Sequence, residues 1–238
     1  PPASYCIPLF RIFDDFCLKQ NVEYLKIEFL NYRRGCMGGE AVDTYVNSKS
    51  IVGLGTGSTV YWAIVRLAEK LTSGELTEIT CVATCETTRK HLDHMNIPCA
   101  VLNADVVDVM IVGADCVLPD LSTIKGVGVD TVLHERMMLE CARKAVCIVD
   151  NSKIRSENEN VSLPVAIASF GYELTIGKIL NLAASNASFT AKLRCNSSGR
   201  KAVTVSGNYI VDLIFSSMID DTATLVESIN AVVGVVEH

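Results

Sequence analysis

The stretch 51-IVGLGTGSTV-60 decides the fold, because it passes from an apolar run through three glycines and then continues as "YWAIVRLAEKL". The apolar start is typical of a buried strand, and the apolar residues after the glycines recur with helical spacing. A helix is therefore predicted over 58–73, with Ser58 as its N-cap, Lys70 in its last turn and Gly74 at its end. Three interpretations of the turn are open: a nucleotide site, a sugar-phosphate site, or a tight turn without a ligand.

A helical pattern precedes this stretch, and strands and helices alternate after it. Strand-like apolar runs occur at 51–54, 78–84, 98–102, 106–115 and 146–153. Helical periodicity occurs at 40–46, 58–73, 85–96 and 130–145. Strands that alternate with helices of about 10 to 15 residues are typical of a parallel sheet covered by helices. The predicted fold class is therefore α/β, with a largely parallel Rossmann-like sheet.

The pattern changes after Lys153. The polar segment at 151–164, "NSKIRSENENVSLP", ends in a proline and is predicted to be a boundary. The runs beyond it follow the order strand, helix, strand, strand, helix, which fits a small split-βαβ domain. We predict an α/β catalytic domain over 1–158, with 1–35 as an unassigned extension, and a smaller α+β domain over 159–233. Residues 234–238 are predicted to begin a return to the large domain.

Charge, cysteine usage and hydropathy restrict the function classes. A net charge of −6 without any basic run longer than two residues argues against a nucleic-acid partner, but a few lysines suffice for an anionic small substrate. The ten cysteines form no C-x-x-C pair and the four histidines complete no zinc spacing, so we expect reduced thiols and no metal. No apolar stretch reaches the ~18 residues of a membrane span, and residues 1–20 lack a secretory pattern. We predict a cytoplasmic protein without a membrane partner, with an organelle such as a plastid as the alternative.

The glycine turn suits an anion without matching the common nucleotide motifs. A turn that leads into a helix start offers backbone N–H groups and the positive end of the helix dipole. The third glycine of Gly53–Ser58 falls one place early for the dinucleotide fingerprint, and the strand at 78–84 ends without an acidic residue. No lysine follows the last glycine, as a Walker motif requires. The hydroxyls of Thr56, Ser58 and Thr59 can donate to phosphate or sugar oxygens, so a nucleotide-dependent oxidoreductase is the weaker alternative.

A second group of polar residues follows other predicted strands. Its members are Asp115, Lys125 beside Gly126 and Gly128, Glu135 on the next helix, and Lys153. Each has a structural explanation when taken alone: a turn cap for Asp115, solvated charges for the lysines, and for Glu135 an ion pair with Arg136 or Lys144. The carboxyl ends of parallel strands meet at one edge of a sheet. The glycine turn, the two lysines and the two carboxylates are therefore predicted to converge on one pocket.

In this order the segments resemble the type A family of ribose-5-phosphate isomerases, over roughly residues 38–238. The family pattern G-x-G-T-G-S-T matches Gly53–Thr59 at every specified position. The D-G-A-D-E block and the I-K-G-G-G run are similar to "VGADCVLPDLSTIKGVG" at 112–128. The R-E-K motif resembles "HER" at 134–136, and D-x-S-K matches "DNSK" at 150–153. "LPVAIASFG", "GNYIVDLIF" and "GVVEH" resemble later segments of the family.

The resemblance implies a reaction and a set of site residues. It implies interconversion of ribose 5-phosphate and ribulose 5-phosphate through an enediol, in the non-oxidative pentose phosphate pathway, without a metal or cofactor. By resemblance Glu135 is the base, Lys125 stabilises charge on the substrate oxygen, and Asp115 binds sugar hydroxyls and helps to open the ring. The implied substrate-binding residues are Thr56, Gly57, Ser58, Thr59, Gly113, Ala114, Gly126, Gly128 and Lys153. A homodimer or homotetramer is also implied.

Several positions depart from the family pattern. Val112 and Cys116 replace acidic residues, and Val127 and Val129 interrupt the glycine run. The interval from Lys125 to Glu135 is one residue longer than in the family, so that either the loop bulges or Glu135 is turned away from the site. The alternative function is therefore a catalytically weak or inactive relative that binds a sugar phosphate or a protein partner. Replacement of Val112 by Asp is expected to raise activity.

Overall fold

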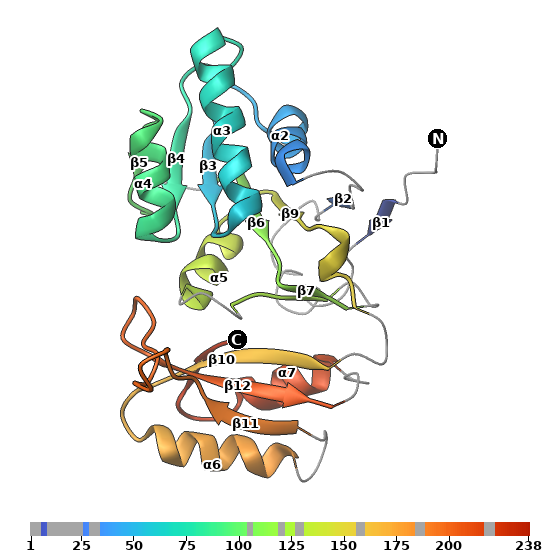
Figure 1. The fold of residues 1–238 in the computed structure, drawn as a ribbon, viewed down its shortest axis with the longest axis vertical. Helices are drawn as coiled ribbons and strands as arrows, with labels where there is room; N and C mark the ends of the chain where they lie inside the picture. The colour runs from blue at the N-terminus through green and yellow to red at the C-terminus, as the bar shows by residue number, and fades with distance from the viewer. Residues whose placement is uncertain are drawn as a thin grey trace. The chain divides into compact units, whose positions relative to one another are not determined.

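The computed structural model describes residues 6–8, 26–28, 34–103, 107–118, 122–126, 131–155, 160–183, 189–216 and 222–238. The chain divides into two compact units. The first unit comprises Pro1–Ser122 and His134–Ile154, and the second comprises Thr123–Leu133 and Arg155–His238. Each unit is described by itself (Figure 1). The domain boundaries expected from the sequence, at 158 and 233, stay a prediction.

A parallel sheet forms the centre of the first unit. Its strands are β3 (Ile51–Leu54), β4 (Thr80–Ala83), β5 (Cys99–Ala100), β6 (Val109–Gly113) and β9 (Ala145–Ile148). They run in the order β5-β4-β3-β6-β9, and every neighbouring pair is parallel. The helices are α2 (Arg34–Tyr45), α3 (Ser58–Ser73), α4 (Glu86–His94) and, from His134 onward, α5 (Val132–Glu140). The predicted α/β class with a largely parallel sheet is confirmed.

Shorter elements complete the first unit. Strands β1 (Cys6–Pro8) and β2 (Lys26–Glu28) form an antiparallel pair. Strand β7 (Cys116–Val117) follows β6, and the short helix η1 (Asn151–Lys153) follows β9.

Among the residues that the structure describes, no helix combines the length and the hydropathy needed to cross a membrane.

The strand order places a topological switch point at β3. From β3 the chain builds β4 and β5 on one side of the sheet, and it then crosses to build β6 and β9 on the other side. Loops that leave neighbouring strands in opposite directions open a crevice at their carboxyl ends, and ligands of such sheets bind there. The turn after β3 and the residues after β6 lie at this switch point.

Alternate residues of β6 face two different cores. Val109 and Ile111 pack into the core that contains residues of α2, α3 and α4, whereas Met110 and Val112 pack into the core that contains Met138 of α5. The period of two in a strand therefore sends one set of side chains to each face of the sheet. The sheet is covered on both sides, which explains why its strands read as continuous apolar runs.

Helix α3 has the predicted extent but begins differently from the prediction. The N-cap is Gly57, with φ 114°, and Ser58 is the first helical residue; no side chain caps the helix. The prediction of Ser58 as the N-cap was therefore wrong. The chain turns through a positive φ at the capping position, a conformation that glycine adopts much more readily than serine. Gly74 ends the helix with φ 79°, and Lys70 lies in the last turn, as predicted.

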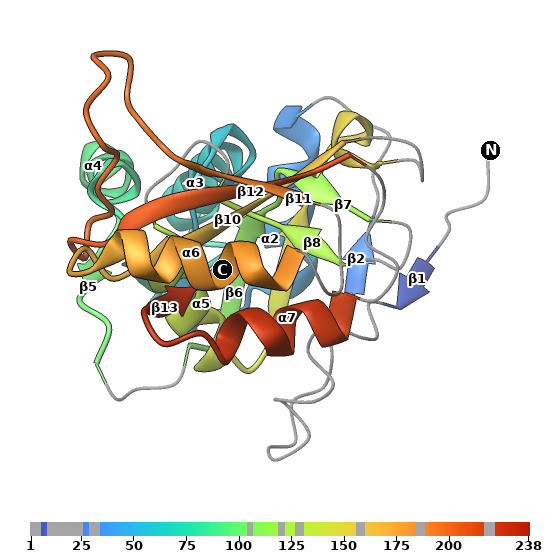
Figure 2. The same cartoon turned by 90° about the horizontal axis from the view of Figure 1, so that it is seen from below.

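The second unit is built around an antiparallel sheet. Its main strands are β10 (Val161–Ile167), β11 (Phe189–Leu193), β12 (Tyr209–Phe215) and β13 (Val235–Glu237), in the order β11-β12-β10-β13. Helices α6 (Tyr172–Ala183) and α7 (Thr222–Asn230) contact each other and lie side by side in Figure 2. The short strand β8 (Thr123–Ile124) also belongs to this unit. Residues 234–238, expected to begin a return to the large domain, include β13, which pairs with β10.

Strand β10 begins at Val161, within the polar segment 151–164 that was predicted to be a boundary. It includes Pro164, which lies opposite Asp212 of β12. A proline removes a hydrogen-bond donor from a strand, which is why the sequence indicated a boundary there. Strand β13 pairs with β10 at Ala166 and Ile167, beyond Pro164, so the proline lies outside that ladder.

Gly53 provides the first prediction, because it determines how closely α5 packs on the sheet. A methyl group at Gly53 would lie 2.6 Å from Met138 Sδ and 2.8 Å from Met110 Sδ. Gly53→Ala is therefore expected to lower the free energy of unfolding in urea by about 1–3 kcal/mol, through overpacking. The matched control is Gly177→Ala in α6, where a methyl group would meet nothing within 4 Å. That substitution should raise the free energy of unfolding by about 0.5–1 kcal/mol, and equal effects of the two would contradict the packing argument.

Candidate active site

The turn after β3 meets the end of β6. Gly55 and Thr56 are buried, Gly57 and Ser58 are exposed, and Thr59 is half-buried. A Cβ placed on Gly113, the last residue of β6, would lie 3.9 Å from the carbonyl oxygen of Thr56 and 3.6 Å from that of Ile148. The ends of β3, β6 and β9 therefore lie together at one edge of the sheet, as the sequence predicted.

Glu135 on α5 reaches this turn. Its side chain is buried, with the residue 2% exposed. Its Oε1 accepts a hydrogen bond from the backbone N–H of Thr56 at 2.8 Å and a second from Thr56 Oγ1 at 2.7 Å. A buried carboxylate is costly unless donors satisfy it, and two donors on one oxygen also fix the plane of the group. The longer interval between Lys125 and Glu135 has not turned this side chain away from the turn.

Arg136 and Lys144, the cations that a structural explanation for Glu135 invokes, each contact another side chain. Arg136 pairs with Glu140, with 3.5 Å between Nε and Oε1. Lys144 Nζ lies 5.4 Å from the centre of the Tyr45 ring. The hydrogen bonds from Thr56 join Glu135 to the glycine turn, so the placement of Glu135 is linked to the candidate site.

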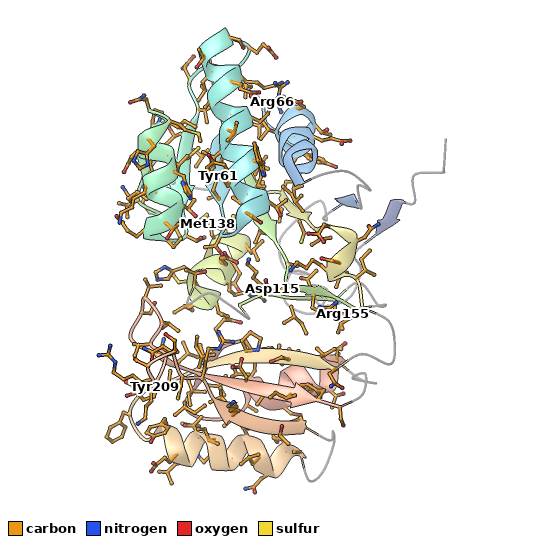
Figure 3. All side chains as sticks on the ribbon, viewed as in Figure 1. Tyr61, Arg66, Asp115, Met138, Arg155 and Tyr209 are labelled. Atoms are coloured by element: carbon orange, nitrogen blue, oxygen red, sulfur yellow. The ribbon has the colours of Figure 1, made fainter. Side chains whose placement is uncertain are left out.

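Gly53 in β3 and Gly55 in the turn after it allow α5 to pack closely against the sheet. A Cβ on Gly55 would lie 3.2 Å from Glu135 Oε1 and 3.0 Å from Val112 Cγ2, and a Cβ on Gly53 would collide with Met138. Gly53 and Gly55 are two residues apart in extended backbone, so they face the same side of the sheet. Glu135 and Met138 are three residues apart on α5, so they lie on the same face of that helix. Figure 3 labels Met138 at this junction. The G-x-G spacing therefore allows α5, the helix that carries Glu135, to pack closely against the strand.

Further side chains hold the backbone of the turn. The carbonyl of Leu54 accepts hydrogen bonds from Thr84 N–H at 3.1 Å and from Thr84 Oγ1 at 3.3 Å. The carbonyl of Gly55 accepts one from Thr88 Oγ1 at 2.8 Å. The imidazole Nδ1 of His134 lies 3.0 Å from the carbonyl oxygen of Thr84. Sequence reasoning missed all three side chains, because each acts on a backbone atom that no local pattern identifies.

The remaining candidates of the first unit lie at the same edge of the sheet. Ala114 is buried in the core beside α5, and Asp115, half-buried, follows β6 and is labelled in Figure 3. Lys153 is the last residue of η1, and its N–H donates to the carbonyl of Asp150 at 2.9 Å. The side chain of Asp150 accepts from Ser152 N–H at 2.9 Å and so caps this short helix. The contacts of Asp115 and Lys153 with a substrate stay a prediction.

Lys125 and Gly126 belong to the second unit. Gly126 has φ 104°, and a Cβ there would lie 2.5 Å from Val132 Cγ2. Its carbonyl accepts a hydrogen bond from Arg194 Nη1 at 2.7 Å, and Arg194 forms a bidentate ion pair with Asp212 of β12. Arg194 therefore anchors the segment that carries Lys125, a role that the sequence did not indicate. The predicted convergence of Lys125 with Glu135 stays a prediction, and Gly128, Val127 and Val129 lie outside the described residues.

Val112 changes one expectation from the sequence. The residue is 6% exposed and packs in the core beside α5, next to Gly55 and close to Glu135. An aspartate at this position would be buried near a second carboxylate, and both burial and like charge disfavour its ionised form. The structure therefore predicts that an acid at 112 is harmful, which reverses the expectation of a gain in activity.

The fold and the site together define a class: an α/β protein whose buried acid is held by a hydroxyl-bearing glycine turn at the switch point of a parallel sheet. A family model described as ribose 5-phosphate isomerase A (phosphoriboisomerase A) matches residues 80–238. The chain belongs to this family. In the described residues, no group of three or more His, Cys, Asp or Glu side chains is placed to hold a metal ion.

Individual relatives agree with the family match. The chain is 34% identical over 204 residues to ribose-5-phosphate isomerase A of Listeria monocytogenes, which covers 85% of this chain and 87% of the relative. The structure of ribose 5-phosphate isomerase from Plasmodium falciparum superposes with a TM-score of 0.79 at 31% identity, over 86% of this chain and 87% of that chain. A D-ribose-5-phosphate isomerase in complex with phospho-erythronic acid superposes with a TM-score of 0.76 at 28% identity, over 86% and 87%.

The buried position of Val112 gives the second prediction. Val112→Asp should lower the free energy of unfolding by about 3–5 kcal/mol at neutral pH, because the core disfavours the ionised form that the aspartate adopts in the unfolded chain, and it should lower kcat/KM. Urea unfolding and a turnover assay measure the two effects. Val112→Asn, with nearly the same shape and no charge, is the control that isolates the electrostatic part. Higher activity of the Asp variant with undiminished stability would restore the expectation from the sequence.

Proposed function

We propose that the chain interconverts ribose 5-phosphate and ribulose 5-phosphate, as an aldose–ketose isomerase of the pentose phosphate pathway. The observation that carries the proposal is the hydrogen-bonded pair of Thr56 and Glu135, which joins the family's G-T-G-S-T turn to a buried carboxylate. Membership of the isomerase family gives the reaction and the substrate. It also removes the support for a nucleotide-dependent oxidoreductase, and no observation favours the inactive alternative.

The reaction needs a base that moves one proton between adjacent carbons. The carboxylate of Glu135 takes the C2 proton from the open-chain aldehyde, and the electron pair of the broken C–H bond forms the C1–C2 double bond while charge develops on O1. The proton on O2 then moves to O1, and return of the proton from Glu135 to C1 gives the ketone with a hydroxyl on C1. The two hydrogen bonds from Thr56 fix the plane of the carboxylate, which suits a base that acts at two neighbouring carbons.

The other candidate residues have supporting roles in this proposal. Lys125 stabilises the charge that develops on the substrate oxygen, and Asp115 binds the sugar hydroxyls and assists ring opening. The exposed part of the turn, Gly57–Thr59, offers N–H groups and hydroxyls at the start of α3, a setting that suits an oxyanion. Gly113, Ala114, Gly126, Gly128 and Lys153 line the substrate. Only a proton moves, so the mechanism calls for no redox cofactor.

Assembly and location are parts of the same proposal. The resemblance to the family supports a homodimer or homotetramer, which light scattering at several concentrations tests directly. A cytoplasmic location is proposed, with a plastid as the alternative because one relative from Arabidopsis thaliana is named a probable chloroplastic ribose-5-phosphate isomerase. Fractionation of cells that express the full-length protein distinguishes the two locations.

The third prediction removes the base and keeps its shape. Glu135→Gln is expected to lower kcat by about 10²–10⁴-fold, since the amide cannot accept the C2 proton. The Gln carbonyl still accepts from Thr56, so the protein should stay folded. Glu140→Gln is the matched control, because Glu140 lies on the same helix, is exposed and pairs with Arg136. It should change kcat less than twofold.

Two measurements separate loss of chemistry from loss of binding. Exchange of the C2 proton of ribose 5-phosphate with deuterated water follows enediol formation directly. Thermal stabilisation by phospho-erythronic acid reports binding at the site without turnover. We expect Glu135→Gln to lose exchange and to retain stabilisation. Exchange by Glu135→Gln at the wild-type rate would show that another residue is the base. If the wild-type protein is stabilised by phospho-erythronic acid but catalyses no exchange, it is a binding protein and not an isomerase.

A further inference from the structure

One peptide unit of the glycine turn is hydrogen-bonded at both of its polar ends to side chains. Its carbonyl, which belongs to Gly55, accepts from Thr88 Oγ1 at 2.8 Å. Its N–H, which belongs to Thr56, donates to Glu135 Oε1 at 2.8 Å. The carbonyl and the N–H of a trans peptide point in opposite directions. The hydroxyl, the peptide and the carboxylate therefore form one continuous hydrogen-bonded chain.

The direction of the Thr88 hydroxyl is determined by its neighbours. A carbonyl can only accept, so the single Thr88 hydroxyl proton points to Gly55. The contact of 3.4 Å between Thr88 Oγ1 and Cys85 Sγ must then have the thiol as its donor. The same sulfur accepts from Thr88 N–H at 3.5 Å. Thr88 is 4% exposed, in the first turn of α4, so this arrangement is shielded from water.

We propose that Thr88 is a positioning residue for the base Glu135, acting through the peptide between Gly55 and Thr56. The inference rests on the proposed function, because it assigns Glu135 as the base. Thr88 does not touch the carboxylate. It fixes the orientation of the peptide whose N–H binds the carboxylate, and it makes that N–H a stronger donor.

Two physical effects give Thr88 this role. A donor on a carbonyl polarises the peptide, and such polarisation strengthens the next hydrogen bond in a chain by perhaps 10–30%. The second effect is conformational, because Gly55 has no side chain of its own to restrict rotation of the turn. The close approach of Glu135 requires a glycine at 55, so the restraint that a side chain would supply has to come from elsewhere. The Thr88 hydroxyl supplies it.

The test compares three threonine variants in the full-length protein. Thr88→Val removes the hydroxyl and keeps the shape, and Thr88→Ser keeps the hydroxyl. The matched control is Thr72→Val in α3, where Thr72 Oγ1 also donates to a backbone carbonyl, that of Ala68, at 2.8 Å. If Thr88→Val does not fold, Thr88→Ala takes its place with the same expectations.

The expected result is a loss of turnover that follows the hydroxyl. Thr88→Val should lower kcat about tenfold, the equivalent of one net hydrogen bond in the transition state, with KM changed less than twofold. The primary isotope effect on kcat for ribose 5-phosphate deuterated at C2 should rise, because proton transfer becomes slower relative to the other steps. Thr88→Ser should restore both values to within twofold of the wild type, and Thr72→Val should change neither.

Other outcomes overturn the inference in distinguishable ways. A Thr88→Val variant that loses stability but keeps kcat and the isotope effect has lost a structural hydrogen bond alone, which overturns the positioning role. Failure of Thr88→Ser to restore turnover overturns it as well, because shape rather than the hydroxyl would then matter. A wild-type protein without turnover overturns the proposed function and this inference together, whereas an active wild type with an equally active Thr88→Val variant overturns the inference alone.

Discussion

The site depends on one interaction, the pair of hydrogen bonds that Thr56 donates to the buried carboxylate of Glu135. It links α5 to the turn after β3, two segments that the chain separates by 79 residues. Without hydrogen-bond donors, a carboxylate in this position would destabilise the fold, because burial disfavours its charge. The donors in turn require that α5 lie against the strand, and this explains why glycines stand at 53 and 55.

The same constraint gives the glycine turn a meaning that its motif alone does not reveal. Glycine turns at strand ends are commonly explained by the approach of a phosphate. Here the buried residues Gly53–Thr56, at the end of β3 and the start of the turn, face a helix that carries the candidate base, whereas Gly57–Thr59 are exposed or half-buried. One short segment thus serves two purposes: its first half positions an acid, and its second half presents N–H groups and hydroxyls. In the second unit, Arg194 similarly fixes the backbone next to Lys125.

Much of the fold could be predicted from the sequence, because hydrophobic periodicity encodes strands and helices locally. The order of the elements, the extent of α3 and the candidate Glu135 followed from such patterns and from the resemblance to the family. The roles of Thr88 and Arg194 could not, because their hydrogen bonds join residues 33 and 68 positions apart and end on backbone carbonyls. The start of α3 was misjudged since a positive φ at Gly57 takes the capping position from Ser58. The burial of Val112 depends on where α5 packs, which no local pattern contains.

A double-mutant cycle of Thr56→Val and Glu135→Met in urea unfolding tests the central contact most directly. Glu135→Met removes the hydrogen-bond acceptor and puts an apolar side chain of similar length in its place. If Thr56 and Glu135 are hydrogen-bonded as described, Thr56→Val should cost about 1.5–3 kcal/mol in the wild-type background and much less in the Glu135→Met background. Effects of the two substitutions that add within about 0.5 kcal/mol would show that the two residues do not interact, and would contradict the account of the site.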